Sequence, residues 1–551
     1  MRVNLSTTAT AMKFCGKNSL LNNSNAVNFG ANKKIQVSEE KAKEIGDSLS
    51  TSTSGHRAVY GGENFNPGIV ELITLGFAEY VNKRRKEGNN PNVIIGGDTR
   101  VATAESLPVV RNVLAGQGVD VQTIPYPVPT PLLAMAARDN NVTAAVLMTA
   151  SHNPWSDGGY NLVTANGAIA PASVTKEVAK YMSQIASVGV YSEKDKKGKI
   201  TEIEPYDGYK RQIEDYHMID WDRIRSSGIK VYYDALRGTG KNTFPRLLND
   251  YGVPFVEVVG QATEGPNPVE KNLSALRKAV CETENPFALG LTNDGDADRF
   301  GIIDEKGKFI TPNDVLLLVG YHLVHNRDKQ GAIIRSQATS RQLDRFAQNN
   351  DFETIETPVG FKYIAEEIMD MRKRDKDILV AGEESGGLTV SGHIPEKDGI
   401  IALELIMDLV AAEGKPLSEI LEKVKSSLGV HYSSALISRK MLDNSEKEAV
   451  MRKIASLYNE VKDDGKIDIF GSQYKVDREK TLAQRETMES FREGGDGYNF
   501  ILEDGSSLLF RKSGTEPLVK SYIEAQGDTK EEAQKKSCDL QKIVSEILDE
   551  K

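Results

Sequence analysis

A serine with a histidine beside it stands at the end of a short apolar run. Ser151 and His152 occur in residues 149–154, which directly follow the apolar residues 144–148. The apolar run predicts a buried strand, and open α/β sheets place their ligands at the carboxyl ends of their strands. The serine hydroxyl is therefore a candidate for chemistry at a sheet edge. The structural alternative is that Ser151 and Asn153 cap the next turn, with His152 as an ordinary hydrogen-bonded side chain.

Three aspartates alternate along a second loop. Asp294, Asp296 and Asp298 follow the apolar residues 289–292, and alternate residues of an extended segment point the same way. At about 4 Å and an effective dielectric constant near 20, each pair of carboxylates repels by roughly 4 kcal/mol. Such a group is expected to bind a hard cation, and oxygen ligands suit Mg²⁺ or Ca²⁺. A solvated acidic turn is the alternative, but the residues between the aspartates are glycine and alanine, which add no other polar group.

A calcium loop of the EF-hand kind fits part of this pattern, because Glu305 is the twelfth residue counted from Asp294. We reject it because the sixth residue is Arg299, where that loop requires glycine for its turn. Residues 299–303 and 308–310 also predict two strands around a turn, whereas an EF-hand loop lies between helices.

Two further loops carry groups that suit binding. Residues 382–387 present two carboxylates and a hydroxyl, which could accept and donate hydrogen bonds to sugar hydroxyls; glutamates are equally common at a helix N-terminus. Residues 511–515 combine an arginine, a lysine and two hydroxyls with Gly514. Arginine can fork onto phosphate oxygens, and glycine lets backbone N–H groups turn toward an anion. A hairpin turn with incidental charge is the weaker alternative, because every residue of this run is a donor or allows a backbone donor to turn.

Taken together and in this order, the four loops resemble those of the α-D-phosphohexomutase family, which includes phosphoglucomutases and phosphomannomutases. The similarity extends over the chain from roughly residue 50. The resemblance implies that Ser151 carries a phosphoryl group. It also implies that Asp294, Asp296 and Asp298 bind Mg²⁺, with the serine phosphate as a further ligand.

The resemblance also assigns contacts with the substrate. Glu383 and Ser385 match residues that hold the sugar hydroxyls, and residues 357–362 match a substrate loop that is most like the one in glucose-preferring members. The substrate-binding residues that the resemblance implies are Arg299, Thr357, Gly360, Lys362, Glu383, Ser385, His393 and Lys397. The implied phosphate-binding residues are Arg511, Ser513, Gly514 and Thr515.

The chain departs from its relatives where a proton acceptor is needed. Many members have a lysine at the position of Asn161, and an amide cannot take a proton at neutral pH. The remaining candidates for a catalytic role beside Ser151 are His152, Arg57 and Lys397, which the sequence does not rank. The motif that contains Arg57 is also imperfect, because Ala58 stands where glycine is usual.

We therefore predict a phosphohexomutase, an intramolecular phosphotransferase that interconverts hexose 1-phosphate and hexose 6-phosphate. The expected route is a phosphoserine enzyme and a hexose 1,6-bisphosphate intermediate, with glucose as the first choice of sugar. We expect Mg²⁺ as cofactor and glucose 1,6-bisphosphate as priming activator. The alternatives are a phosphomannomutase, a phosphoglucosamine mutase, or a non-catalytic phosphosugar-binding paralogue, which Asn161 motivates.

Strand, polar loop and helix recur in three successive blocks, and the pattern changes after about residue 430. This predicts an α/β fold with three doubly wound α/β domains and a smaller α+β C-terminal domain around a central cleft. The expected limits are a disordered tail at 1–49, a phosphoserine-bearing domain at 50–227, a metal-binding domain at 228–326, a sugar-recognition domain at 327–429 and a phosphate-binding domain at 430–551. Among the single elements, residues 105–117 predict a helix, provided that Pro108 lies in its first turn.

Composition limits the class of protein. A chain of 551 residues suggests about three or four domains. A net charge of −10 without a long basic block argues against a nucleic-acid partner. Three widely spaced cysteines and the lack of a long apolar run favour a cytoplasmic protein that does not enter a membrane. The expected partner is a phosphorylated hexose, and the expected assembly is a monomer or weak homodimer. The acid-poor N-terminus would also fit an organelle transit peptide, which we consider the weaker interpretation of the tail.

Overall fold

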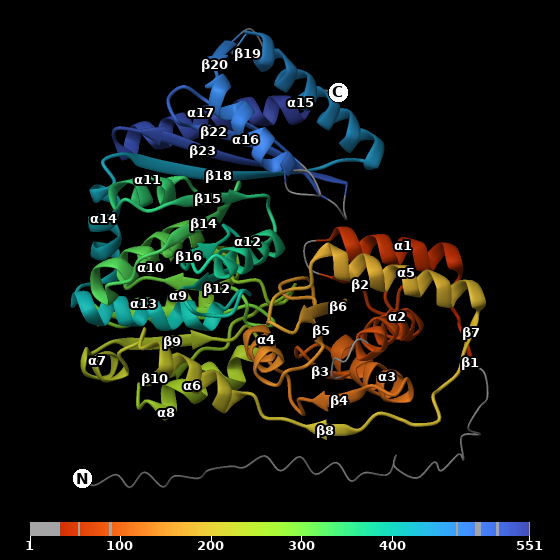
Figure 1. The fold of residues 1–551 in the computed structure, drawn as a ribbon. Coiled ribbons are helices and arrows are strands. Elements are labelled where there is room, and N and C mark those ends of the chain that lie inside the picture. The colour runs from red at the N-terminus through yellow and green to blue at the C-terminus, as the bar shows by residue number, and fades with distance from the viewer. Residues whose placement is uncertain are drawn as a thin grey trace, which may run out of the picture.

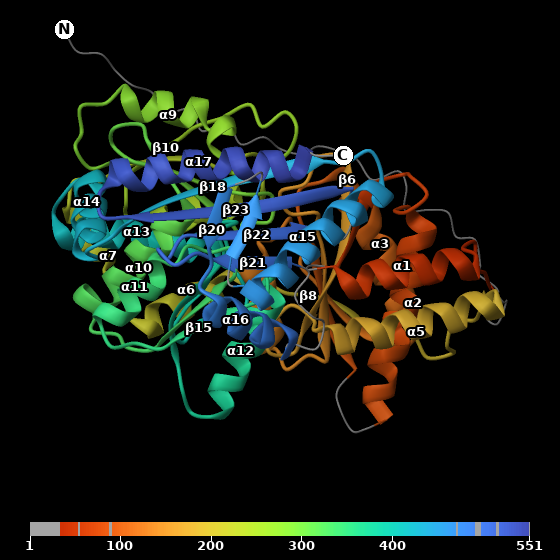
Figure 2. The same cartoon turned by 90° about the horizontal axis from the view of Figure 1, so that it is seen from above.

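The computed structural model describes residues 33–52, 55–86, 91–464, 466–469, 472–490, 497–513 and 517–549. Its described residues form four domains, each built on its own large sheet (Figure 1). The first domain lies beside the stacked second and third domains, and the fourth domain covers the third (Figures 1 and 2). The predicted class, three doubly wound α/β domains followed by a smaller α+β domain, is confirmed.

The first sheet has six strands. In spatial order they are β2 (His56–Val59), β6 (Asp157–Thr164), β5 (Ala144–Met148), β3 (Asn92–Gly97), β4 (Asp120–Thr123) and β8 (Ile200–Glu202). Four helices pack together over one face, where they share a buried core: α1 (Glu39–Thr51), α2 (Pro67–Lys86), α3 (Val101–Gly116) and α5 (Ala172–Val188). The other face is covered by α4 (Thr130–Asp139), which packs against α6 (Tyr206–Tyr216). A short strand pair, β1 (Lys33–Lys34) with β7 (Val190–Tyr191), ties the start of the described chain to this domain.

The second and third sheets follow the same plan. The second has the order β10 (Phe255–Glu257), β9 (Lys230–Asp234), β11 (Ala288–Asn293), β12 (Phe300–Ile303) and β13 (Phe309–Ile310). The third has the order β15 (Thr354–Thr357), β14 (Ala332–Ser336), β16 (Ile378–Gly382) and β17 (Leu388–Val390). Around them lie α7 (Trp221–Ser226), α8 (Phe244–Asp250), α9 (Ser274–Cys281), α10 (Pro312–Arg327), α11 (Gln342–Asn349), α12 (Phe361–Lys373), α13 (Gly399–Glu413) and α14 (Leu417–Ser427), with two 3₁₀ turns, η1 (Thr239–Asn242) and η2 (Glu270–Asn272).

One strand order recurs in all three α/β sheets. The second, first and third strands of each unit lie parallel in that spatial order, and the fourth strand joins the third antiparallel. In each unit one loop connects the third strand to the fourth. These are the serine loop (residues 149–156), the acidic loop (residues 294–299) and the Glu-Glu-Ser loop (residues 383–387). Three loops that are far apart in sequence therefore occupy equivalent places at the carboxyl ends of parallel strands, where α/β folds bind ligands.

A buried helix joins the second domain to the third. This helix is α13, which begins after Asp398 and ends before Gly414, a left-handed C-cap. Together with α10, α13 lies between the second and third sheets (Figure 1), and nearly all of its residues are buried. The two sheets share one continuous apolar core through these helices, so we expect the acidic loop and the Glu-Glu-Ser loop to keep a fixed relative position.

The fourth domain is an antiparallel sheet with helices. Its spatial order is β18 (His431–Lys440), β23 (Leu518–Gly527), β22 (Ser507–Lys512) and β21 (Gly497–Ile501). The core forms between this sheet and two helices, α15 (Asn444–Asp464) and α17 (Lys530–Asp549). The remaining elements are α16 (Arg478–Ser490) and a hairpin of β19 (Lys466–Ile469) and β20 (Ser472–Lys475). Within the described part of the chain, no helix has the length and apolar character needed to cross a bilayer.

Two local expectations differ from the structure. Residues 39–49 of the expected disordered tail belong to α1, which Ser38 caps by accepting a hydrogen bond from the Lys41 backbone N–H; residues 1–32 lie outside the described part. The helix expected at 105–117 already begins at Val101, so Pro108 stands in its interior and not in its first turn. Pro108 itself is exposed, and the burial of Val110 and Leu114 on the same helix offsets the one backbone hydrogen bond that proline cannot make.

Candidate active site

Ser151 lies at the end of β5 and is completely buried. Its φ is +51°, a left-handed conformation that is uncommon for a residue with a side chain. Its backbone N–H donates to Thr149 Oγ1 at 2.8 Å, and its hydroxyl donates to Asp294 Oδ2 at 2.8 Å. His152 Nδ1 lies 3.3 Å from the same hydroxyl. The serine loop and the acidic loop, 143 residues apart, therefore meet at the serine hydroxyl.

A buried ion pair supports the backbone of the serine loop. The guanidinium of Arg100 donates to the carbonyl oxygens of Ser151 at 2.6 Å and Asn153 at 2.7 Å, and also to that of Pro154. Asp98 accepts from Arg100 Nε at 3.0 Å and from the hydroxyls of two threonines, including Thr149 at 2.8 Å. The sequence analysis missed this pair. The sequence signal that could have identified it is a pair of opposite charges directly after the apolar strand β3.

The acidic loop brings its three carboxylates together. Asp294, Asp296 and Asp298 are at most 3% exposed, and one oxygen of each lies within 4.8 Å of the others. Burial and mutual repulsion raise the pKa of Asp294 well above its usual value and also raise that of Asp296. Burial acts in the same direction on Asp298, but Lys397 and Arg299 outweigh it and lower its pKa. The structure thus confirms the predicted cluster as a group.

Each carboxylate has one oxygen fixed by a neighbour. Arg299 N donates to Asp294 at 3.1 Å, Thr130 Oγ1 donates to Asp296 at 2.9 Å, and Lys397 Nζ pairs with Asp298. The second oxygens of Asp296 and Asp298 are buried without a hydrogen-bond partner among the described residues. Three clustered carboxylates, two of which have an open oxygen, suit a hard divalent cation, so the residues present could hold a metal ion.

Glycine is required where the two loops touch. A Cβ atom at Gly295 would lie 2.7 Å from the carbonyl oxygen of Ser151. Real Cβ atoms do not come that close to a backbone oxygen, so a larger residue would push the two loops apart. The glycine in the acidic motif therefore controls the distance between the serine and the carboxylates.

Cations from three domains surround the serine and the carboxylates. Arg57 on β2 is half-buried, and its Nε is buried without a hydrogen-bond partner among the described residues. Lys397 is 8% exposed and reaches the acidic loop from the third domain. Burial, together with Arg299, Arg57, Lys397 and Lys520, holds the pKa of His152 well below its ordinary value. The imidazole beside Ser151 is therefore neutral near pH 7.

The Glu-Glu-Ser loop joins the acidic loop through backbone bonds. Phe300 N donates to Gly386 O at 3.2 Å, and Arg299 Nη1 donates to Ser385 O at 3.4 Å. Glu383 accepts from Gly360 N at 2.9 Å, and burial together with Glu384 raises its pKa to about 7. The hydroxyl of Ser385 is buried without a partner among the described residues. A carboxyl and a hydroxyl are thus available beside the acidic loop.

Other expected substrate residues have different surroundings. The Thr357 hydroxyl bonds to backbone carbonyl oxygens, and buried Lys362 lies on the first turn of α12. His393 is 1% exposed, and its Nε2 lies 2.8 Å from Asp398 Oδ2. The ring of His393 packs in the interior against Tyr209, so the structure corrects its expected role as a direct substrate contact. A histidine in a polar loop gave no sign that a buried carboxylate would bind it.

Asn161 and Glu396 line a small cavity beside Arg57 and Lys397. The amide nitrogen of Asn161 donates to the carbonyl oxygens of Leu147 and Thr149, at 3.3 and 2.9 Å. Glu396, which the sequence analysis did not select, is buried, and burial raises its pKa to about 7 against the opposing effect of Lys397. Asn161 is therefore bound to the backbone of the serine strand, and it offers no titratable group.

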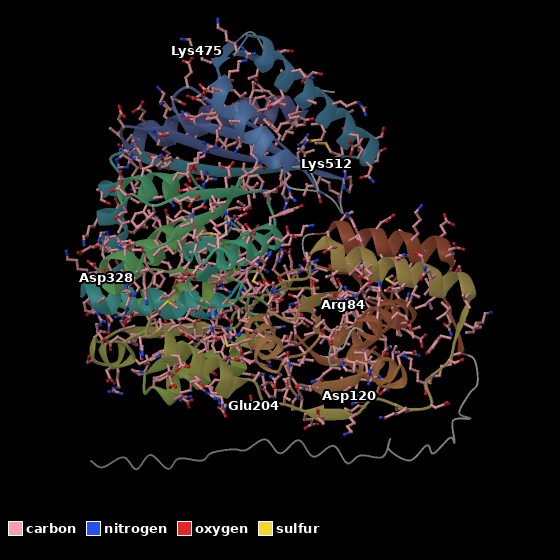
Figure 3. All side chains as sticks on the ribbon, viewed as in Figure 1. Arg84, Asp120, Glu204, Asp328, Lys475 and Lys512 are labelled. Atoms are coloured by element: carbon pink, nitrogen blue, oxygen red, sulfur yellow. The ribbon has the colours of Figure 1, made fainter. Side chains whose placement is uncertain are left out.

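The fourth domain contributes cations to this region. Arg511 and Ser513 lie at the end of β22, whereas Gly514 and Thr515 lie outside the described residues. Arg511 acts electrostatically on Tyr522, which also interacts with Glu383 and Glu384, and Lys520 acts on His152. Lys512, the neighbour of Arg511, marks the edge of the fourth domain in Figure 3. The predicted phosphate loop thus begins next to the Glu-Glu-Ser loop.

Comparisons with known proteins agree with this geometry. Four models of phosphoglucomutase/phosphomannomutase domains match the chain: α/β/α domain I at residues 48–188, domain II at 207–307, domain III at 311–427 and the C-terminal domain at 473–537. A phosphoglucomutase/phosphomannomutase of Thermococcus kodakarensis is 27% identical over 477 residues, which cover 85% of this chain and 93% of the relative. A phosphoglucomutase of Staphylococcus aureus is 27% identical over 508 residues, which cover 86% and 89%.

A solved structure shares the fold. The open form of parafusin, a phosphoglucomutase of Paramecium, superimposes with a TM-score of 0.72 at 19% identity and covers 91% of this chain and 95% of its own. All four predicted loops lie within or beside the matched domains. The similarity therefore extends over the whole arrangement of domains around the site.

Proposed function

The chain belongs to the phosphoglucomutase/phosphomannomutase family, and on that premise we propose that it interconverts hexose 1-phosphate and hexose 6-phosphate through phosphoserine at Ser151. Glucose is the first choice of sugar, and mannose and glucosamine phosphates are the alternatives. The observation that carries the proposal is the 2.8 Å hydrogen bond from the buried Ser151 hydroxyl to Asp294 of the acidic cluster. A hydroxyl that only capped a turn would have no reason to meet a metal-binding group from another domain.

The residues that would hold Mg²⁺ are Asp294, Asp296 and Asp298, with a phosphate oxygen on Ser151. When bound, the ion neutralises negative charge on the phosphoryl group and so lowers the barrier to its transfer. The chain itself supplies Arg57 and Lys397 beside the carboxylates. Both side chains remain charged near pH 7 and would stabilise the transferring phosphoryl group.

Transfer from the enzyme requires a free hydroxyl of the sugar phosphate to attack the phosphorus. The bond from phosphorus to Ser151 Oγ then breaks, the sugar hydroxyl gives up its proton, and Ser151 Oγ takes up a proton, which leaves a free serine hydroxyl. In the return step Ser151 Oγ attacks the other phosphate of the bisphosphate and must lose its own proton. We assign that proton to His152, because it is neutral and its Nδ1 lies 3.3 Å from Oγ. A neutral imidazole can accept a proton without first losing one.

The sugar and its second phosphate need separate contacts. We propose that Glu383 and Ser385 bind the sugar hydroxyls, because both offer buried polar atoms beside the acidic loop. We propose that Arg511, Ser513, Gly514 and Thr515 bind the phosphate that is not being transferred. The bisphosphate would reverse its orientation between the two steps, and glucose 1,6-bisphosphate would prime unphosphorylated enzyme.

A coupled assay with Mg²⁺ and glucose 1-phosphate, together with mass spectrometry of the peptide that contains Ser151, tests this proposal. We expect turnover and a phosphate on Ser151, and both should be lost in Ser151→Ala. Ser156→Ala is the matched control, because Ser156 is an exposed serine of the same loop whose hydroxyl donates to Asp157. Turnover that survives in Ser151→Ala would disprove the phosphoserine route.

A second candidate follows from Asn161, which places an amide at a position where relatives carry a lysine. The chain would then bind phosphosugars without turnover. Protein that is phosphorylated on Ser151 and binds glucose 1-phosphate, but converts none of the three hexose phosphates, would favour this candidate. Measured conversion of any one of them would exclude it.

A further inference from the structure

A buried cluster of hydrogen bonds surrounds Asp398, one residue after Lys397. The hydroxyl of Tyr209 donates to Asp398 Oδ2 at 2.8 Å, and His393 Nε2 lies 2.8 Å from the same oxygen. Asp398 Oδ1 accepts from the backbone N–H groups of Ile400 and Ile401 at 2.8 and 3.1 Å. Tyr209, His393 and Asp398 are at most 1% exposed, and the side chains of Tyr209 and His393 direct their polar atoms to Asp398.

The cluster does more than cap a helix. Capping of α13 uses only Oδ1, because an N-cap side chain needs one oxygen for the free N–H groups of the first turn. The second oxygen receives two further side chains, from α6 and from the loop before Asp398. Two donors on one oxygen and two on the other leave the carboxylate a single orientation. The backbone on either side of Asp398 is fixed with it.

That backbone holds the acidic loop at two points. Lys397 Nζ pairs with Asp298, and Gly399 N donates to the carbonyl oxygen of Ala297 at 3.1 Å. Ala297 has a φ of +57°, a conformation that costs energy for a residue with a Cβ atom and needs support from its neighbours. Residues on both sides of Asp398 therefore grip consecutive residues of the acidic loop.

The side chain of Lys397 passes close to Gly387 before its ammonium group reaches Asp298. A Cβ atom at Gly387 would lie 2.4 Å from Lys397 Cδ and 2.7 Å from its Cγ. The aliphatic part of the lysine thus crosses directly over Gly387, and its backbone N–H donates to Glu396 at 3.0 Å. Small displacements at Asp398 would move the ammonium group relative to Asp298, because Lys397 is the residue directly before Asp398 and its aliphatic part lies against Gly387.

We infer that Tyr209 and His393 are positioning residues, which act through Asp398 to hold Lys397 against the acidic loop. The catalytic consequence rests on the proposed function, whereas the positioning itself does not. If the chain is a phosphohexomutase, loss of the Tyr209 hydroxyl should lower kcat and leave the KM for the sugar phosphate nearly unchanged. The reason is that Lys397 would be misplaced relative to the phosphoryl group while the other sugar contacts remain.

The position of Lys397 can be measured without an activity assay. Limited acetylation of lysines, quantified by mass spectrometry, reports how often each ammonium group leaves its partner. In Tyr209→Phe we expect the modification rate of Lys397 to rise roughly tenfold, which is the size expected for one lost hydrogen bond to a carboxylate. Lys362 and Lys447 are buried in other parts of the molecule and serve as internal standards whose rates should not change.

A neighbouring tyrosine provides the matched control. Tyr206 lies on the same helix, is equally buried, and donates its hydroxyl to Asp250 at 2.8 Å. Tyr206→Phe therefore removes the same atom and the same kind of bond, and should leave both the Lys397 rate and kcat unchanged. His393→Phe is the second test variant and should act like Tyr209→Phe. An unchanged Lys397 rate in both test variants would overturn the inference, as would an equal rise at Lys362 and Lys447.

The labelling result also separates this inference from the proposed function. A selective rise at Lys397 in a chain that converts no hexose phosphate would support the positioning role and reject the mutase. A chain that turns over, with unchanged Lys397 labelling and unchanged kcat in both variants, would support the mutase and reject the positioning role.

Discussion

The serine loop and the phosphate loop of the fourth domain are both expected to hold phosphate, yet they are supported differently. Three carbonyl oxygens of the serine loop bind one buried arginine, and Trp155 crosses into the second domain, where its Nε1 donates to Ala262 O at 2.8 Å. The phosphate loop begins at half-buried residues, and Ser513 O accepts from Lys447 Nζ at 3.0 Å within the same domain. The first loop is held by two domains, and the start of the second is supported by Lys447 of its own domain.

This difference suits the two tasks that we propose. Ser151 exchanges a phosphoryl group with the sugar beside the same acidic cluster in both half-reactions, so its loop gains from a single geometry. The distant phosphate site must accept a sugar that is bound through its 1-phosphate in one step and through its 6-phosphate in the other. A loop supported by its own domain can adjust to both orientations, because its movement does not disturb the serine.

The largest effect should follow from removing the ion pair under the serine loop. Asp98→Ala leaves Arg100 buried without its carboxylate partner, and broken buried pairs typically cost about 3–5 kcal/mol. We expect the free energy of unfolding in urea to fall by about that amount at pH 7, with loss of any activity. Asp139→Ala is the control, because Asp139 pairs with Arg138 on the surface, where such pairs contribute roughly 1 kcal/mol or less. Equal losses in the two variants would show that the serine loop does not depend on its buried support.

A second prediction concerns the pH dependence of stability that the buried carboxyl group of Glu396 causes. Burial raises the pKa of Glu396 from 4.5 to about 7, so the folded protein binds a proton more tightly than the unfolded chain. Stability that is fully present below about pH 4.5 is then lost as the pH rises toward 7, by an amount on the order of 3 kcal/mol. Glu396→Gln should remove this part of the decline in the free energy of unfolding with rising pH. Urea unfolding of metal-free protein between pH 4.5 and 8 measures it. Glu503→Gln, on the exposed surface of the fourth domain, should leave the decline as it is. If the wild type and Glu396→Gln gave parallel curves, Glu396 would not carry this cost.

The same contrast explains what the sequence could predict. The four loops were predictable because their residue types are unusual at strand ends, and apolar runs such as residues 144–148 marked the strands before them. The supporting residues were not predictable in this way. Arg100 binds carbonyl oxygens 51 to 54 residues away, and Tyr209 binds Asp398 across 189 residues. Such pairs depend on tertiary packing, and nothing in the local pattern of either partner identifies the other.

Helix α1 shows a different kind of error. The polar first part of residues 1–49 dominates the composition of this range and conceals the signals of a helix near its end. Local signals were present, because Ser38 is followed by two glutamates in the first turn and by buried residues at helical spacing. His393 shows the opposite case, in which a residue in the right motif has a supporting role because a buried carboxylate lies next to it.

The smallest predicted effect tests the comparison most directly, because it removes one hydrogen bond from each loop. Trp155→Phe removes the bond to Ala262, and Lys447→Met removes the bond to Ser513. Each should cost roughly 1 kcal/mol, but the kinetic consequences should differ. A loosened serine loop should lower kcat a few-fold at unchanged KM, since the attacking and leaving oxygens are then less well aligned. A loosened phosphate loop should raise the KM for hexose 1-phosphate a few-fold at unchanged kcat. If both variants changed the same kinetic constant, the two loops would not divide alignment and phosphate binding between them.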